Sequence, residues 1–198
     1  MLYCAKTLFP ATTIVIILLS TSISFAQEER YALIGAAQRN DIAEVKALLN
    51  QGVDVNIKGN QYGKTAFFYA ADQGNMEMMQ LLLGHGADVN IQDHDGQTPL
   101  IMAAYLSSVY PEDNIRHQQV VDFLLENKTA VNAQNKRGQT ALMASARYGN
   151  PGTTKKLLAK GGDINIKDYD GNTPLVLAVK GNRLDTLRTL RDSGINIY

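Results

Sequence analysis

Few residues in this sequence could do chemistry, and the first to consider is a histidine between two aspartates. Asp93, His94 and Asp95 stand in the run "IQDHDGQTP". Imidazole and carboxylate groups bind divalent metals, so this run could serve a metal-dependent hydrolase. Adjacent side chains on one tight turn rarely converge on one ion without a second cluster of ligands. We therefore expect solvated turn residues here, and we predict no metal and no cofactor.

The other candidates for chemistry are weaker. His85 occupies a turn position, and His117 begins a helix, where we expect it to be exposed. Asp168 and Asp170 stand in a polar stretch, where solvated charges without a strong pKa shift are expected. The sequence has no G-x-x-x-x-G-K phosphate loop and no G-x-S-x-G elbow, and its one cysteine is Cys4. We therefore predict no catalytic residues and no enzyme activity.

The first 26 residues have the pattern of a secretory signal peptide. Lys6 precedes the uncharged, largely apolar run "LFPATTIVIILLSTSISF", and Ser24-Phe25-Ala26 forms a small-x-small cleavage site. The most apolar part, residues 14–19, is much shorter than the ~20 residues of a membrane-spanning helix. We predict a cleaved signal peptide over 1–26, with an uncleaved anchor as the alternative.

The overall charge argues against nucleic acids and membrane surfaces as partners. The chain has 19 basic and 19 acidic residues, and the loss of Lys6 with residues 1–26 changes this balance by one. Nucleic acids and anionic lipids favour clustered basic surfaces. The remaining residues 27–198 contain no cysteine, so an exported chain must be held together by its core alone.

A phrase of the form G-x-T-[A/P] occurs four times, and its spacing indicates structural repeats. The glycines are separated by 33, 42 and 33 residues. A period near 33 is typical of stacked units that bury their apolar faces against one another. An apolar residue followed by asparagine precedes each phrase. The glycines are Gly63, Gly96, Gly138 and Gly171, and the asparagines are Asn56, Asn90, Asn132 and Asn165.

The residues within one unit predict two helices and a turn. Thr98 and Thr173 stand before a proline, which suits a capping hydroxyl followed by the first helical position. A residue suited to the left-handed end of this first helix follows: Asn40, Gly74, Gly149 and, one position early, Gly181. The second helix ends near a pair of leucines, such as Leu82-Leu83 or Leu157-Leu158. A Gly/Asp/Asn-rich turn then leads to the next unit.

With these phrases, the chain resembles the ankyrin-repeat family. The family's T-P-L-H-x-A phrase is matched by "TPLIMA", "TPLVLA", "TALMAS" and "TAFFYA", although its histidine is absent from all four. The resemblance implies an all-α solenoid of five helix-turn-helix repeats with short finger turns over 27–198. The expected repeats are 28–61, 62–95, 96–137, 138–170 and 171–198. It also implies a monomer that binds another protein through its concave face.

The resemblance assigns a candidate surface to the turn tips and the exposed side of each first helix. Tyrosine and arginine are enriched among the residues that dominate protein interfaces. The alternative is that some of the rings shield neighbouring helix ends. The surface comprises Tyr62, Lys64, Asp72, Gln73, His94, Asp95, Gln97, Tyr105, Lys136, Arg137, Gln139, Arg147, Tyr148, Tyr169, Asp170, Asn172 and Lys180.

The third unit departs from the repeat. From the leucine of its T-P-L phrase to the asparagine of its apolar-Asn pair there are 32 residues, against 23 in units two and four. The nine extra residues are expected between its helices, within Tyr105 to His117. Either this insertion is neutral, because solenoids tolerate loops, or it contacts a partner through Tyr110.

These observations predict non-catalytic protein binding in an exported compartment, most simply the periplasm of a Gram-negative bacterium, with secretion as the alternative. Small periplasmic ankyrin proteins resemble immunity proteins that occlude an envelope-acting toxin. A second use is a scaffold or stabilising partner of a periplasmic enzyme, as in ankyrin proteins linked to peroxide resistance. A metal-dependent hydrolase built on His94 is the alternative from another class.

Overall fold

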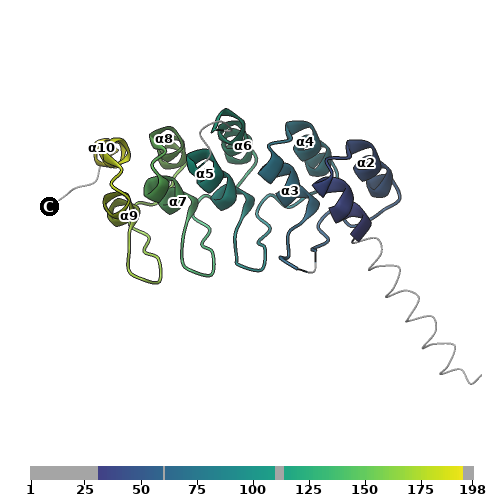
Figure 1. The fold of residues 1–198 in the computed structure, drawn as a ribbon, viewed down its shortest axis with the longest axis horizontal. Coiled ribbons are helices and arrows are strands. Elements are labelled where there is room, and N and C mark those ends of the chain that lie inside the picture. Colours follow the sequence, from purple (N-terminus) through teal and green to yellow (C-terminus); the bar gives the residue numbers. More distant parts are fainter. Residues whose placement is uncertain (1–30, 60, 110–113, 194–198) are drawn as a thin grey trace, which may run out of the picture.

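The computed structural model describes residues 31–59, 61–109 and 114–193; the predicted signal peptide and Tyr110 lie outside them. Helices follow one another in five pairs, and no strand occurs in this part of the chain. Figure 1 shows two rows of helices with the fingers projecting from the side of the first row. The first row consists of residues 31–38, α3 (Ala66–Gln73), α5 (Pro99–Val109), α7 (Ala141–Tyr148) and α9 (Pro174–Lys180), and the second of α2 (Ile42–Asn50), α4 (Met76–Gly84), α6 (Asn114–Glu126), α8 (Pro151–Ala159) and α10 (Leu184–Asp192).

The threonine of each G-x-T phrase begins a first-row helix, as predicted. Thr98 Oγ1 accepts a hydrogen bond from the Ile101 N–H at 3.2 Å. The side chains of Thr65, Thr140 and Thr173 each accept a hydrogen bond from the N–H three residues later in the chain. A side-chain oxygen at this position satisfies an N–H that has no partner inside the helix. The repeat therefore keeps threonine because each helix of the first row needs this bond.

Left-handed residues end most of the first-row helices. Gly74 and Gly149 have φ values of 64° and 86°, and Asn40 has a φ of 61°, as the sequence predicted. The prediction for Gly181 was wrong, because this residue is right-handed with a φ of −82°. Asn182, with a φ of 55°, takes the left-handed position instead. Asparagine tolerates this conformation better than other residues with a side chain, so the fifth repeat keeps the usual spacing.

The core is a continuous apolar layer between the two rows of helices. One leucine of each predicted pair is buried in it: Leu49, Leu82, Leu124 and Leu157. Burying a leucine fully is worth about 1.5–3 kcal/mol relative to leaving it exposed. Because neighbouring repeats share this layer, the array is held together by contacts between repeats rather than by one closed core.

The insertion in the third repeat mostly lengthens two helices, which corrects the expected loop. α5 has 11 residues where α3 and α7 have 8, and α6 has 13 where α4 and α8 have 9. An added helical turn satisfies its backbone groups internally, whereas a loop leaves them to solvent or to side chains. The extra residues thus raise the third repeat above its neighbours at the end away from the fingers.

His117 is buried rather than exposed, which also corrects the sequence analysis. Only 5% of this residue is accessible. Its Nε2 lies 3.0 Å from the carbonyl oxygen of Asp72, at the end of α3. The lengthened α6 places the ring against the preceding repeat. His117 therefore joins two repeats, a role that its place after an insertion did not reveal.

In three of the apolar-Asn pairs, the asparagine ties one repeat to the next. Asn132 Nδ2 donates to the carbonyl of Gly161 at 2.9 Å, and its Oδ1 accepts from the N–H of Asp163 at 2.8 Å. Asn56 and Asn90 make the same two bonds to the repeats that follow them. An amide side chain offers a donor and an acceptor together, which explains why asparagine recurs here.

Among the described residues, no helix has the length and apolar character that crossing a membrane requires.

Candidate functional site

We number each finger by the repeat whose first-row helix it precedes, so the third, fourth and fifth fingers lead into α5, α7 and α9. One acidic or amide side chain closes each of these three fingers. Asp93 Oδ1 accepts hydrogen bonds from the N–H groups of Asp95 and Gln97, both at 2.9 Å. Asn135 and Asp168 hold their own fingers in the same way. Asx side chains commonly bond to N–H groups further along a turn. The Asp93 carboxylate of the "DHD" run therefore serves the finger itself.

Adjacent fingers are joined by single backbone hydrogen bonds. The N–H of His94 donates to the carbonyl of Tyr62 at 2.8 Å, and the N–H of Lys136 donates to that of Asp95 at 2.9 Å. A third bond, of 3.0 Å, runs from Tyr169 to Arg137. These bonds fix each finger relative to the next, so side chains from several repeats have defined relative positions.

Asp168 is buried, which corrects the expectation of a solvated charge. It is 6% accessible, and its Oδ1 accepts from the backbone N–H of Asn172 at 2.7 Å. Burial alone raises the pKa of a carboxyl group. Here the hydrogen bonds from Asn172 and Asp170, together with the charge of Lys180, outweigh burial and lower the pKa of Asp168 below 3.8. This carboxylate stays ionised as a structural group of the fifth finger.

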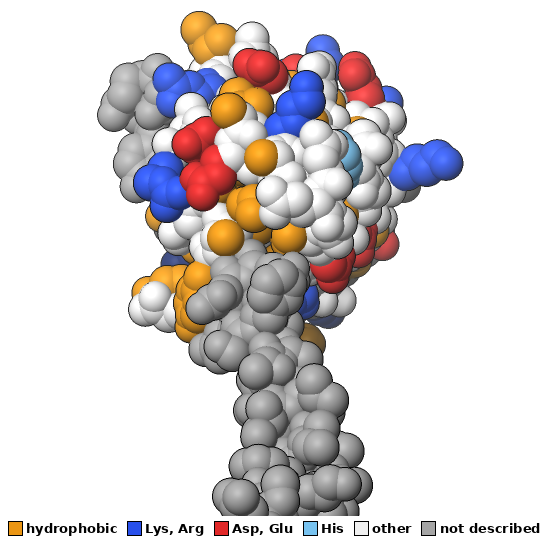
Figure 2. All heavy atoms as spheres, turned by 90° about the vertical axis from the view of Figure 1, so that its right-hand side faces the viewer, with side chains coloured by type: hydrophobic (Ala, Val, Ile, Leu, Met, Phe, Trp, Pro, Cys, Tyr) orange, Lys and Arg blue, Asp and Glu red, His pale blue; other side chains and the backbone are white. Residues whose placement is uncertain are grey.

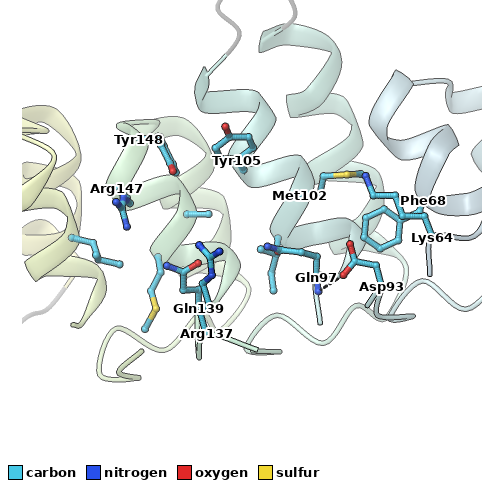
Figure 3. Close-up of a pocket in the computed structure, with 14 residues that line it drawn as sticks. Lys64, Phe68, Asp93, Gln97, Met102, Tyr105, Arg137, Gln139, Arg147 and Tyr148 are labelled. Atoms are coloured by element: carbon cyan, nitrogen blue, oxygen red, sulfur yellow. Dashed lines mark hydrogen bonds between the residues drawn. The ribbon is translucent and has the colours of Figure 1, made fainter. Parts of the chain in front are cut away.

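A concave groove of about 320 Å³ lies between the first-row helices and the fingers. Its walls come from α3, α5, α7 and α9 and from the fingers that precede α3, α5 and α7 (Figure 3). We define the concave groove by its lining residues: Lys64, Phe68, Asp93, Gln97, Ile101, Met102, Tyr105, Arg137, Gln139, Met143, Ala144, Arg147, Tyr148 and Leu177.

Two tyrosines form the end of the groove that lies away from the fingers (Figure 3). Tyr105 comes from α5 and Tyr148 from α7, and their ring centroids are 4.8 Å apart with an interplanar angle of 83°. This edge-to-face arrangement is a favoured geometry for aromatic pairs and is worth about 0.5–1.5 kcal/mol beyond burial. Tyr105 is still 37% accessible, so a ring surface held in place by its neighbour remains open to a ligand.

Three cations line the groove. Lys64 Nζ lies 5.5 Å from the ring centroid of Phe68, and Arg147 Cζ lies 5.9 Å from that of Tyr148. Arg137 projects from the fourth finger (Figure 3). None of these three side chains forms an ion pair within the described part of the chain. Cation–π contacts orient Lys64 and Arg147 without neutralising their charges.

The groove offers fewer acceptors than donors. Its single carboxylate, Asp93, already accepts two N–H groups of its own finger. Gln97 Oε1 is buried and has no hydrogen-bond partner among the described residues. A buried acceptor without a partner costs free energy, about 1–3 kcal/mol on mutational scales, until a donor reaches it. The groove as a whole thus presents positive charge and an aromatic pair.

The structure brings part of the predicted candidate surface together and leaves the rest apart. Seven of its members line the groove: Lys64, Gln97, Tyr105, Arg137, Gln139, Arg147 and Tyr148. Other members lie on the exposed fingers: Tyr62, His94, Asp95, Lys136, Tyr169 and Asp170. Beside the fifth finger, Asn172 donates its backbone N–H to Asp168, and its side-chain oxygen accepts from Lys180 Nζ at 2.6 Å.

Asp72 and Gln73, also members of the candidate surface, take part in contacts between repeats. Gln73 Nε2 donates to the carbonyl of Gln38, at 2.9 Å, and to that of Ala37, at 3.3 Å. The carbonyl of Asp72 faces His117. Both residues are half-buried at the end of α3. The Gln73 Nε2 group and the Asp72 carbonyl thus have partners in neighbouring repeats.

Sequence reasoning missed the apolar floor of the groove. Phe68, Ile101 and Met143 occupy the position at which the T-P-L-H-x-A phrase has its histidine, and all three are buried at the groove. The comparison with the family phrase shows that the histidine is absent, but it does not indicate what the residues in its place do. The recurrence of a large apolar residue at this one position of successive repeats is the signal that could have identified the floor of the groove.

The proposed metal ligands do not form a cluster. Among the described residues, no three His, Cys, Asp or Glu side chains are grouped so as to hold a metal ion. His94 is exposed, and its ring lies against Gly63 of the preceding finger. The carboxylate of Asp93 is held by its own turn. These contacts give the "DHD" run a structural role in the stacking of fingers.

Comparison with known proteins agrees with this architecture. A family model described as ankyrin repeats (3 copies) matches residues 2–93, 33–115 and 110–198. Neurogenic locus notch homolog protein 1 of Homo sapiens is 32% identical over 93 residues, which are 44% of this chain and 4% of that protein. A putative ankyrin repeat protein of fowlpox virus is 31% identical over 87 residues, covering 43% of this chain and 46% of the viral protein.

A third relative is similar over a shorter stretch. An ankyrin repeat-containing protein of Schizosaccharomyces pombe is 41% identical over 56 residues, covering 28% of this chain and 27% of the yeast protein. The chain thus spans less than half the length of each of these relatives. The shared part is the repeat itself, with its capped helices and fingers. The chain belongs to the ankyrin-repeat family.

Proposed function

We propose that this chain is a non-catalytic protein-binding module that holds part of a partner protein in the concave groove. The observation that carries this proposal is the contrast in bonding within the groove region. The finger side chains at repeat positions bond to the protein itself, whereas Lys64, Arg137 and Arg147 have no ion-pair partner in the described structure. Free charges beside a fixed aromatic pair suit a protein ligand, because tyrosine and arginine dominate many interfaces.

Site-specific crosslinking tests this use of the groove. A photo-reactive amino acid replaces Tyr105 in one variant and Gln80 in the other, because Gln80 is exposed on α4 in the opposite row of helices. We expect a crosslinked partner from position 105 and none from position 80. Equal crosslinking from both positions, or crosslinking from position 80 alone, would remove the groove as the binding surface.

We further propose that the module acts in the periplasm of a Gram-negative bacterium, with secretion as the alternative. The support is the run over residues 1–26, with its basic start, apolar middle and small-x-small end. N-terminal sequencing of the protein recovered from the envelope should begin at Gln27. A chain that retains Met1 would contradict cleavage and would favour an uncleaved anchor.

Within that compartment we propose an immunity or inhibitor role, in which the array occludes a toxin that acts on the envelope. When the partner is bound in this groove, the array can cover the partner's active site and so block it. The alternative is a scaffold or stabilising partner of a periplasmic enzyme. Activity of the crosslinked partner, measured alone and in an equimolar mixture with the chain, separates the two: inhibition supports the immunity role, and unchanged or longer-lived activity supports the stabilising role.

A further inference from the structure

We infer that the segment held in the concave groove is acidic and carries an apolar or aromatic side chain. This inference rests on the proposed function, since it specifies the chemistry of the partner that the groove would bind. The groove has two distinct parts, and each part selects one property of the ligand. Figure 3 shows both, with the tyrosine pair at one end and Arg137 with Gln139 beside the fingers.

Charge complementarity sets the acidic character. Lys64, Arg137 and Arg147 face the groove without ion pairs in the described structure, against one carboxylate, Asp93. That carboxylate is partly neutralised by the N–H groups it accepts. A basic segment would bring its cations near three like charges, whereas carboxylates form strong, often bidentate hydrogen bonds with arginine. An acidic segment is therefore the favoured ligand.

The positive character belongs to the groove and not to the molecule as a whole. The chain has equal numbers of basic and acidic residues. Figure 2, which views the end of the array beside α2, shows acidic, basic and apolar side chains interspersed there. A local excess of one sign on a neutral molecule directs a partner of opposite sign to that place and raises the rate of association.

The aromatic end sets the apolar character. Tyr105 is partly exposed and contacts Tyr148, and the apolar residues Met102 and Ala144 line the same groove. A groove of about 320 Å³ is at the lower end of the range for ligand pockets, about 300–1,000 Å³. It therefore accepts a few side chains of a segment rather than a whole domain, and one of them must cover the tyrosines.

A single-stranded nucleic acid fits these features less well. Bases stack on open aromatic faces, along a continuous positive track. Here the two rings are directed edge to face and contact each other, and the cations are three separate side chains. Mixed acidic and apolar side chains satisfy both parts of the groove, whereas a phosphate backbone satisfies only the charged part.

Selection from a random library tests the inference. Peptides of about 12 residues displayed on phage, which is ample length for a groove of this size, are enriched on the purified chain. A representative enriched peptide is then titrated by fluorescence anisotropy at low and high salt. We expect enrichment of Asp and Glu flanking a Phe, Tyr, Leu or Met, and weaker binding at high salt because exposed ion pairs are screened.

Charge reversal supplies the matched variants. The double substitution Arg137→Glu/Arg147→Glu reverses the two arginine charges in the groove. As a control, Lys155→Glu reverses a positive charge at an exposed position of α8. We expect the first to weaken binding of the acidic peptide at least tenfold, and the second to change it less than twofold. Arg137→Gln/Arg147→Gln serves as a milder version if the reversed protein fails to fold by circular dichroism.

The outcomes separate the inference from the proposed function. Peptides without acidic bias, whose binding is lost in Tyr105→Ala but kept in the charge-reversed variant, would overturn the inference and leave the groove as a binding site. The absence of any peptide sensitive to Tyr105→Ala or to charge reversal would overturn both. Tighter, groove-dependent binding of a mixed-sequence single-stranded RNA would overturn both in favour of nucleic acid.

Discussion

The fingers and the concave groove are adjacent regions built from the same repeats, yet they use their polar side chains differently. In the fingers, Asp93, Asn135 and Asp168 accept N–H groups of their own turns. In the groove, Arg137 and Arg147 have no ion-pair partner among the described residues. The two arginines stand where the repeat imposes no residue type. In this array, the polar residues that recur at the repeat period are structural, whereas Arg137 and Arg147 do not recur and are available to a ligand.

The largest expected effect comes from damaging a finger. Gly96 has a φ of 72°, and an added Cβ would lie 2.9 Å from the backbone nitrogen of Lys136. Gly96→Ala should lower the free energy of unfolding by about 2–4 kcal/mol, because strain and a backbone clash both arise. Urea denaturation measures this change.

Gly171→Ala is the matched control for that substitution. Gly171 has a φ of 80°, but an added Cβ would meet nothing within 4 Å. Only the conformational cost remains, about 1 kcal/mol. If the two variants were equally unstable, close packing between fingers would not be what makes Gly96 necessary.

The next effect concerns the groove and should appear in binding rather than in stability. Tyr105→Ala removes a half-exposed ring that contacts Tyr148. We expect the affinity for the crosslinked partner to fall by about 2 kcal/mol, roughly thirtyfold, as for a buried aromatic anchor. The loss of unfolding free energy should stay near 1 kcal/mol, because only the ring pair is lost.

Calorimetric titration beside urea denaturation separates these two quantities. Tyr105→Phe keeps the ring and should preserve most of the affinity. A variant that loses stability and affinity in equal measure would show that Tyr105 belongs with the structural residues after all.

A smaller effect is expected from the asparagine that links two repeats. Asn132→Ala removes one donor and one acceptor that link the third repeat to Gly161 and Asp163 of the fourth. Exposed hydrogen bonds contribute modestly, so the loss should be about 1–2 kcal/mol in unfolding free energy. Asn132→Asp keeps the acceptor for the Asp163 N–H and should lose less. Hydrogen exchange should show the loss concentrated in α7 to α10, the helices that follow this link, since repeat arrays lose stability locally.

The smallest effect is a pH dependence at the fifth finger. The folded pKa of Asp168 is below 3.8, so its ionised form stabilises the fold above that value, and this contribution is lost as the pH falls through the lower folded pKa. Asp168→Asn should remove this dependence while keeping the finger closed, because Asn135 does the same in the fourth finger. Denaturation of both proteins between about pH 6 and pH 3 measures the difference. Parallel curves would contradict the assignment.

The sequence predicted the helices and their order well because the relevant forces are local. Thr98 and Thr173 cap helices, and Gly74 and Gly149 end them, through contacts within a few residues. The prediction for His117 failed because a neighbouring repeat decided the outcome: its ring is buried against the end of α3. Asp168 was predicted to be solvated, yet its own finger buries it.

The candidate site was predictable only in part, for the same reason. Tyr105 and Tyr148 were assigned to the surface one by one, but nothing in their spacing showed that the rings meet. Gln73 was assigned with them and instead bonds to the preceding repeat. The family resemblance indicates which positions face the concave side. It does not indicate which of those side chains have partners, because partners come from the next repeat.

The sequence alone determined the all-helical repeat, its caps and its period, because hydrophobic periodicity and turn chemistry act over short distances along the chain. Only the tertiary structure decided which charges stay unpaired and which apolar residues form the floor of the groove. Stacking places side chains about one repeat apart into contact, and those contacts depend on the rise and rotation between repeats. The groove and its positive charge are therefore properties of the assembled array.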